Sequence, residues 1–178
     1  MAEIKKVGVL GCGLMGSGIA QVAAAAGYTT VVRDVSDAVM AKGKAGIAKS
    51  LDKFVEKGKL AAADRDATLA RLSYVTDVAA LKDCDIVIEA VTEDLELKND
   101  LWKQLDALCP AHTIFASNTS SLTIAAMASA TKRADRFVGL HFFNPVPLMQ
   151  LVEVVRTVTT STTTFDRALA FGKSLGKE

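Results

Sequence analysis

Short apolar runs alternate with longer amphipathic segments along this chain of 178 residues. The apolar runs predict buried β-strands over residues 4–10, 28–33, 73–76, 85–90, 113–116, 137–142 and 151–155. The segments between them predict helices over residues 19–26, 36–57, 62–72, 94–108, 121–128 and 163–175. Strands separated by helices require crossover connections, which produce a mainly parallel sheet. The pattern therefore predicts a single α/β domain with a Rossmann-like, doubly wound sheet.

Residues with known preferences for helix ends mark three of these helices. Ser36 is a candidate N-cap, and Thr163 is the candidate cap of the last helix, which Gly176 follows. The helix over residues 94–108 has leucines spaced near the helical repeat, and it stops before Pro110. No internal repeat or low-complexity segment interrupts the pattern, so one domain accounts for it.

A glycine-rich turn connects the first predicted strand to the first predicted helix. Its sequence, Gly11-Cys12-Gly13-Leu14-Met15-Gly16, has the G-x-G-x-x-G spacing of dinucleotide-binding loops. In such loops the first glycine permits a tight turn, the second lets the backbone approach a pyrophosphate, and the third lets helix and strand pack closely. The amino end of the helix favours the anion. Glycine spacing alone is a weak signal, but a strand before it and a helix after it predict a dinucleotide site.

An acidic residue ends the second predicted strand and bears on the choice of cofactor. Asp34 lies about 20 residues beyond Gly11, the spacing expected for the carboxylate that binds the adenosine ribose 2′-hydroxyl. The adjacent Arg33 would favour the 2′-phosphate of NADP, whereas the charge of Asp34 would repel that phosphate. We therefore predict NAD as the cofactor.

A histidine and a glutamate occupy two neighbouring predicted strands. His141, one of only two histidines, stands near the end of an apolar run. The chain then breaks at prolines 145 and 147, because proline fixes φ and lacks a donor, and the next strand carries Glu153. An imidazole and a carboxylate so placed can meet as a general base and the group that orients it. From the pair alone, a structural histidine near a salt-bridging glutamate is the alternative.

Composition and charge argue against several classes of function. The formal net charge of +1 gives no electrostatic case for nucleic acid or membrane partners. Cys12, Cys84 and Cys109 are odd in number and lack C-x-x-C spacing, so we expect reduced thiols, a cytoplasmic location and no metal site. The chain enters its first strand almost at once, and we expect neither a signal peptide nor a transmembrane segment.

Four segments resemble the NAD-binding domain of 3-hydroxyacyl-CoA dehydrogenases, and the bacterial 3-hydroxybutyryl-CoA dehydrogenases look closest. They are the glycine-rich turn, residues 88–93 (Ile-Glu-Ala-Val-Thr-Glu), residues 117–121 (Ser-Asn-Thr-Ser-Ser) and the stretch from His141 to Glu153. The resemblance covers essentially all of residues 1–178, and the last two segments are the more specific ones. It implies hydride transfer between NAD and C3 of a short-chain (S)-3-hydroxyacyl-CoA thioester, interconverting 3-hydroxybutyryl-CoA and acetoacetyl-CoA.

The resemblance also implies roles for individual residues. His141 corresponds to the general base, Glu153 to its carboxylate partner, and Ser120 to a serine near the reacting oxygen. The positions that line the nicotinamide end of the cofactor correspond to Glu93, Lys98, Ser120 and Asn144. The positions that contact coenzyme A correspond to Ser50 and Lys57.

Several of these residues also have plainer interpretations. From the residues alone, Lys57 fits a solvated helix face, and Ser120 fits a helix cap. Glu93 and Lys98 fit capping or surface charges near a helix start. Ser50 has no signal of its own.

The resemblance leaves part of the family pattern unmatched. Members of the family continue into a helical second domain, which supplies most of the dimer interface, the wall of the acyl site and an asparagine near the substrate carbonyl. Because the chain stops at Glu178, we expect an isolated cofactor domain whose full-length form is a homodimer. Two alternatives stay open: an NAD-binding module without turnover, and a dehydrogenase of another hydroxyacid class. The spacing of His141 and Glu153 disfavours the second, since such enzymes commonly use a lysine base.

Overall fold

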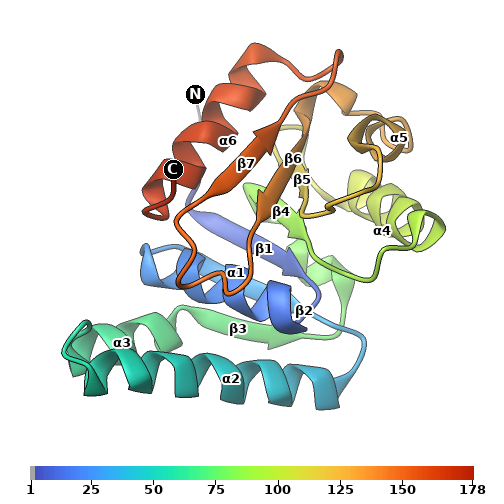
Figure 1. Ribbon diagram of the computed structural model, residues 1–178. Coiled ribbons are helices and arrows are strands. Elements are labelled where there is room, and N and C mark those ends of the chain that lie inside the picture. The colour runs from blue at the N-terminus through green and yellow to red at the C-terminus, as the bar shows by residue number, and fades with distance from the viewer. Residues whose placement is uncertain (1–2) are drawn as a thin grey trace.

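The computed structural model describes residues 3–178 and contains one seven-stranded sheet (Figure 1). The strands lie in the order β3-β2-β1-β4-β5-β6-β7. All neighbouring pairs are parallel except β6 and β7, which are antiparallel. Their bounds are β1 (Lys6–Leu10), β2 (Thr29–Arg33), β3 (Leu72–Val75), β4 (Ile86–Glu89), β5 (Ile114–Ser117), β6 (Phe137–Phe142) and β7 (Val152–Val155).

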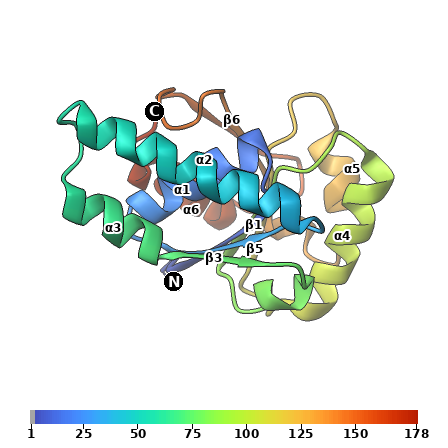
Figure 2. The same ribbon diagram turned by 90° about the horizontal axis from the view of Figure 1, so that it is seen from below.

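Helices cover both faces of the sheet (Figures 1 and 2). Buried side chains of α1, α2 and α6 join one core cluster, and those of α4 and α5 join the other. The helices are α1 (Leu14–Ala25), α2 (Asp37–Glu56), α3 (Ala62–Ala70), α4 (Leu95–Leu108), α5 (Ile124–Ala128) and α6 (Thr162–Ser174), with short 3₁₀ turns η1 (Val78–Leu81) and η2 (Ala134–Arg136). The predicted doubly wound α/β fold with a mainly parallel sheet is confirmed.

The two core clusters follow from the two-residue alternation of the strands. On β1, Val7 and Val9 face the cluster with α1, whereas Leu10 faces the one with α4. In the second cluster the ring of Trp102 stacks on Phe115, and the two ring centroids are 4.9 Å apart. Because both faces of the sheet are buried, residues 86–88 of β4 form a continuous apolar run instead of an alternating one.

The strand order reverses between β1 and β4, and this reversal locates the ligand crevice. From β1 the chain moves outward to β2 and β3, and it then returns to form β4 on the other side of β1. Helices on opposite faces therefore diverge at this point and leave a crevice outside the carboxyl ends of the two strands. Gly11 and Ala90 are the residues that follow β1 and β4 at that crevice.

Several helix ends differ from the sequence-based predictions. The first helix, α1, begins at Leu14 instead of residue 19, and α3 ends at Ala70 instead of residue 72. The helix predicted over residues 121–128 begins only at Ile124, because the Thr119 hydroxyl accepts hydrogen bonds from the amides at positions 121 and 122 and bends the chain there. The cap of α6 is Ser161, whose hydroxyl accepts from the Thr164 amide at 3.1 Å. Thr163, the predicted cap, lies inside the first turn of that helix.

The cap of α2 and the residue that follows α6 are as predicted. The Ser36 hydroxyl accepts from the Val39 amide at the start of α2. Gly176 follows α6 with a positive φ of 73°, a conformation that costs glycine little.

Candidate active site

Steric constraints within the protein apply to two of the three glycines of the glycine-rich turn. Gly11 has a φ of +96°, and a Cβ there would lie 2.6 Å from the Ala90 carbonyl oxygen. A Cβ on Gly16 would overlap the carbonyl oxygen of Gly11. A Cβ on Gly13 would meet no protein atom within 4 Å. Protein packing therefore explains the first and third glycines, and the second borders open space at the amino end of α1.

Asp34 is tied to this turn through backbone amides. Its Oδ2 accepts from the Cys12 amide at 2.8 Å, and its Oδ1 accepts from the Ser36 amide at 3.1 Å. The carboxylate also lines a cavity of about 370 Å³, with Leu97 and Leu101 of α4 among its apolar walls. A charged rim on an apolar cavity suits a ribose and its base.

The non-glycine residues of the turn point in three different directions. Cys12 is buried against Gly43 of α2, and burial, with the Asp34 charge as a smaller cause, raises the pKa of its thiol to about 11. Leu14 lines a cavity beside α2, and Met15 lines the cavity that contains His141. Only the backbone of Cys12 can therefore take part at this site, and its amide is already bonded to Asp34.

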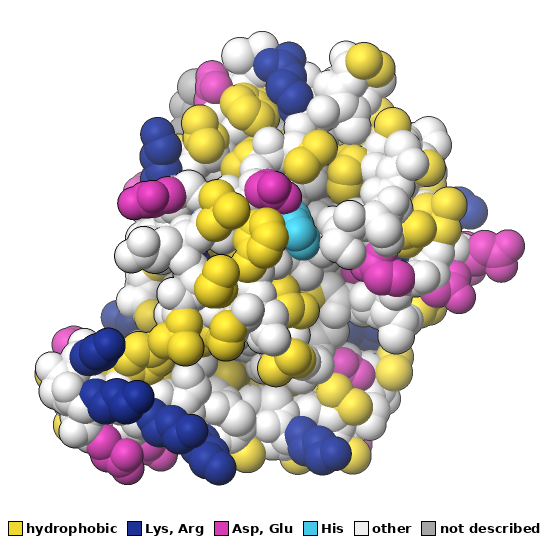
Figure 3. All heavy atoms as spheres, in the orientation of Figure 1, with side chains coloured by type: hydrophobic (Ala, Val, Ile, Leu, Met, Phe, Trp, Pro, Cys, Tyr) yellow, Lys and Arg dark blue, Asp and Glu magenta, His cyan; other side chains and the backbone are white. Residues whose placement is uncertain are grey.

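His141 and Glu153 are opposite partners on the antiparallel strands β6 and β7. Their side chains meet at 2.9 Å between Nδ1 and Oε2. The imidazole is 22% exposed and the carboxylate 53%, and the ring of Phe143 lies 4.6 Å from the imidazole. Figure 3 shows a histidine side chain open to solvent, with an acidic side chain beside it and hydrophobic side chains around.

The cavity at His141 gathers residues from four separate segments of the chain. It has a volume of about 390 Å³ and also reaches the glycine-rich turn through Met15. The other predicted residues that line it are Glu93, Ser120 and Asn144. Glu93 and Ser120 follow the parallel strands β4 and β5, whereas His141 lies on β6 and Asn144 in the loop after it, so only the folded sheet brings them together.

Lys98 is a buried cation, which contradicts the interpretation of it as a surface charge. Its side chain is 1% exposed, and Nζ lies 3.0 Å from Oε1 of Glu89 and 3.0 Å from Oε1 of Glu93. Burial raises the pKa of the Glu93 carboxyl, but hydrogen bonds from Thr119 and Lys98 outweigh it and leave this pKa below its usual value. Sequence reasoning missed Glu89, although an acidic residue inside the apolar run of β4 was a signal for it.

Asn118 is a second residue that the sequence did not single out. Its Oδ1 accepts from the Phe142 amide at 2.8 Å, which joins the loop after β5 to the strand that carries His141. The neighbouring Ser120 is exposed and lines the cavity. The helix-cap interpretation of Ser120 is wrong, because Thr123 occupies the N-cap position of α5.

Ser50 and Lys57 line one cavity of about 420 Å³ between α2 and the loop after β6. The Ser50 hydroxyl accepts from Gln21 Nε2 at 3.0 Å. The basic residues of this cavity are Lys49, Lys53, Lys57 and Lys59, and its other wall includes Asn144 to Leu148. Basic side chains gather along the lower left of Figure 3, where Figure 1 places α2 and α3. The cavity therefore combines an apolar wall with positive charge.

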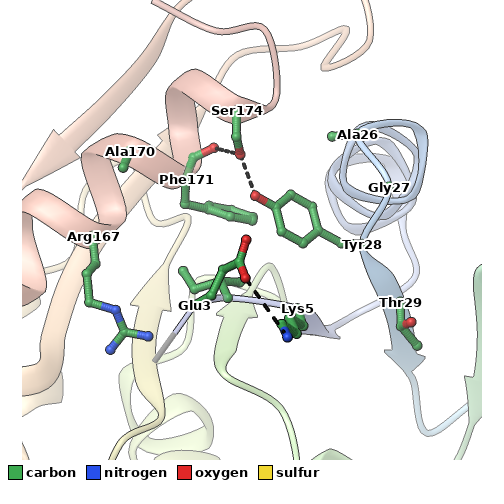
Figure 4. A pocket seen from close by; sticks show the side chains of 11 residues that line it. Glu3, Lys5, Ala26, Gly27, Tyr28, Thr29, Arg167, Ala170, Phe171 and Ser174 are labelled. Atoms are coloured by element: carbon green, nitrogen blue, oxygen red, sulfur yellow. Dashed lines mark hydrogen bonds and ion pairs between the residues drawn. The ribbon is translucent and has the colours of Figure 1, made fainter. Parts of the chain in front are cut away.

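A separate cavity of about 840 Å³ lies at the opposite end of the sheet (Figure 4). Residues before β1, the start of β2 and the second half of α6 line it, among them Tyr28, Arg167 and Phe171. None of the residues predicted for catalysis or cofactor binding lines this cavity. Because ligands of doubly wound sheets bind at the carboxyl ends of the strands, the crevice at His141 is the candidate active site.

Within residues 3–178, His, Cys, Asp and Glu side chains form no group of three that could hold a metal ion. No helix of that range is both long and apolar enough to cross a membrane.

Comparison with known proteins agrees with this geometry. The family model of the 3-hydroxyacyl-CoA dehydrogenase, NAD binding domain, matches residues 6–178. The chain is 53% identical to the mitochondrial hydroxyacyl-coenzyme A dehydrogenase of Rattus norvegicus, with 98% of this chain and 57% of that protein covered. It is 45% identical to 3-hydroxybutyryl-CoA dehydrogenase of Clostridioides difficile, with 97% and 61% covered.

Solved structures give the same result. The (S)-3-hydroxybutyryl-CoA dehydrogenase of Ralstonia eutropha superposes with a TM-score of 0.96 at 49% identity, covering 98% of this chain and 62% of that one. The chain thus spans about three fifths of the length of these relatives. The chain belongs to the 3-hydroxyacyl-CoA dehydrogenase family, and residues 6–178 correspond to the NAD binding domain of that family.

Proposed function

We propose that the chain binds NAD(H) across the carboxyl ends of β1 and β4, with its pyrophosphate at the glycine-rich turn. The open space beside Gly13 and the amino end of α1 support this position. The adenosine would lie in the cavity beside Asp34, whose carboxylate would bind the ribose 2′-hydroxyl and repel a 2′-phosphate. The nicotinamide end would lie in the cavity lined by Glu93, Ser120 and Asn144.

We further propose that the protein acts on a short-chain (S)-3-hydroxyacyl-CoA, with His141 as general base and acid. The 2.9 Å contact between His141 and Glu153 is the observation that carries this proposal. An ionised carboxylate can only accept, so Glu153 would hold the hydrogen on Nδ1 and leave the lone pair on Nε2. That nitrogen would take the proton of the 3-hydroxyl, and Glu153 would stabilise the resulting imidazolium.

Hydride transfer requires an acceptor beside the imidazole, and NAD supplies it. C3 of the substrate would lose its hydride to the nicotinamide while the hydroxyl proton passes to His141. Ser120 would lie near the reacting oxygen, as its place on the same cavity wall supports. The lysine-lined cavity beside α2 suits the phosphates of coenzyme A, with Ser50 and Lys57 as contacts.

The proposal is tested in a version of the protein extended past Glu178 into the second domain of the family, by acetoacetyl-CoA-dependent NADH oxidation with the His141→Ala and Glu153→Gln variants. Removing a positioned general base should lower kcat by about 10²–10⁴, while NADH affinity stays nearly constant. Glu153→Gln should also lower kcat, because the imidazolium loses its charge partner. An unchanged kcat and pH profile for Glu153→Gln would show that the glutamate is structural. Tight NADH binding without acetoacetyl-CoA reduction would support an NAD-binding module and contradict the proposed chemistry.

A further inference from the structure

Glu89, at the end of β4, is a fully buried carboxylate with three partners. Its Oε1 accepts from the Val91 amide at 2.8 Å and lies 3.0 Å from Lys98 Nζ, and its Oε2 accepts from the Ser117 hydroxyl at 2.6 Å. A buried charge is costly unless it is paired and hydrogen-bonded, and these contacts satisfy both conditions. Neither the proposed chemistry nor the proposed cofactor contacts use this side chain.

Lys98 connects Glu89 to the wall of the active-site cavity. Its ammonium lies at 3.0 Å from both Glu89 and Glu93, so two carboxylates share one cation. Glu93 in turn accepts from the hydroxyls of Thr119 and Ser121, which hold the loop that carries the proposed Ser120. The carboxyl of Glu93 has a lowered pKa and is ionised at neutral pH. The triad of Glu89, Lys98 and Glu93 thus carries a net charge of −1, whereas the pair of Lys98 and Glu93 alone would be neutral.

We propose that Glu89 is a positioning residue that makes the nicotinamide end of the cavity negative and thereby favours the oxidised cofactor over the reduced one. The inference rests on the proposed function, in which the nicotinamide ring lies beside Glu93. The ring carries a positive charge in NAD⁺, and hydride addition removes that charge. A negative triad beside the ring therefore binds NAD⁺ more tightly, relative to NADH, than a neutral pair would.

The charge is tested with Glu89→Gln, which keeps the size of the side chain and removes one negative charge. The dissociation constants of NAD⁺ and NADH are measured separately by calorimetry and by NADH fluorescence. We expect the ratio of the NAD⁺ to the NADH dissociation constant to rise by roughly three- to tenfold. The change is no larger because solvent reaches the triad on the exposed side of Glu93 and partly screens its charge from the ring. A purely structural role would weaken both cofactors by the same factor.

A matched control is available on α4, the helix that carries Lys98. Asp106 of α4 forms another ion pair with low exposure, at 2.6 Å from Arg133 Nε, and neither residue lines the active-site cavity. Asp106→Asn should lower stability and leave the ratio of the two dissociation constants unchanged. A shift of that ratio in this control would show that any lost carboxylate produces the effect, and the inference would be overturned.

A second variant keeps the test decisive if Glu89→Gln does not fold. Glu93→Gln removes the other negative charge from a side chain that is 43% exposed, so folding should survive. It should move the ratio in the same direction as Glu89→Gln. Equal weakening of NAD⁺ and NADH in the folded variants would overturn the inference. Failure of the unaltered protein to bind either cofactor would instead refute the proposed function itself.

Discussion

Replacing Gly13 by alanine should separate cofactor binding from folding. Gly13 has a φ of −71° and a ψ of −162°, an extended conformation that any residue adopts. A Cβ at this position would meet no protein atom within 4 Å. The added methyl group would therefore project into the space where the pyrophosphate is proposed to pass.

The effect on stability should be small because two opposing contributions nearly cancel. Replacing glycine by alanine at an unstrained position stabilises a protein by about 0.4–1 kcal/mol through the unfolded chain. Gly13 is also the N-cap of α1, and alanine is a poorer N-cap than glycine by about 0.5–1 kcal/mol. The free energy of unfolding should therefore change by less than about 1 kcal/mol.

The effect on cofactor affinity should be much larger. A methyl group in the path of the pyrophosphate would move the phosphates away from the amino end of α1. Each hydrogen bond lost to a charged group costs about 1.5–3 kcal/mol. Losing one or two of them corresponds to NADH binding weakened on the order of 10²-fold, since about 1.4 kcal/mol is tenfold in affinity.

Urea denaturation followed by circular dichroism measures the first quantity, and NADH fluorescence titration measures the second. Gly16→Ala is the contrasting control, because its Cβ would overlap the Gly11 carbonyl oxygen. That variant should lose about 1–3 kcal/mol of stability through overpacking. If folded Gly13→Ala binds NADH within about twofold of the unaltered protein, a change worth under 0.5 kcal/mol, the pyrophosphate does not pass over Gly13 and the reasoning fails.

Two further predictions concern Asp34 and Asp85. Asp34→Ala should weaken NADH binding more than NADPH binding in fluorescence titrations, because NADH loses its ribose contact whereas NADPH is relieved of the repulsion of its 2′-phosphate. An equal loss of affinity for both cofactors would show that Asp34 only stabilises the turn through its hydrogen bonds. Burial raises the pKa of the Asp85 carboxyl, but hydrogen bonds from the amides of Lys5 and Lys6 and from His112 outweigh it and hold this pKa below its usual value. A lowered folded-state pKa contributes stability that is present above the unfolded value of about 3.9 and is lost as the pH falls through the folded value. Urea denaturation should therefore show that Asp85→Asn destabilises the protein at neutral pH and that its difference from the unaltered protein shrinks below about pH 4; a difference independent of pH would contradict this account.

The local features of this fold could be predicted from the sequence because they depend on residues that are neighbours in the chain. Apolar runs between amphipathic segments predicted the strands and helices, and the helix 94–108 agrees with α4 to within one residue at its start. Two of the boundaries that moved are set by side-chain hydrogen bonds. Thr119 delayed the start of α5, and the Ser161 hydroxyl replaced Thr163 as the cap of α6.

The candidate site could be predicted only in part from the sequence. The glycine spacing predicted the turn, since the requirements for a positive φ at Gly11 and for close packing at Gly16 are local. The two strands with His141 and Glu153 were predicted, but the sheet register makes the two residues direct partners. An antiparallel β7 beside β6 is what turns both side chains toward the same face.

Tertiary structure alone decided the contacts between segments that are distant in the chain. The bonds from the Phe142 amide to Asn118, from the Ser117 hydroxyl to Glu89 and from the Thr119 hydroxyl to Glu93 depend on which strands become neighbours. By itself the sequence placed Lys98 near a helix start, where most lysines are solvated. The folded chain buries its ammonium between two carboxylates, and hydroxyls of β5 and of the loop after it complete the hydrogen bonds that a buried charge requires.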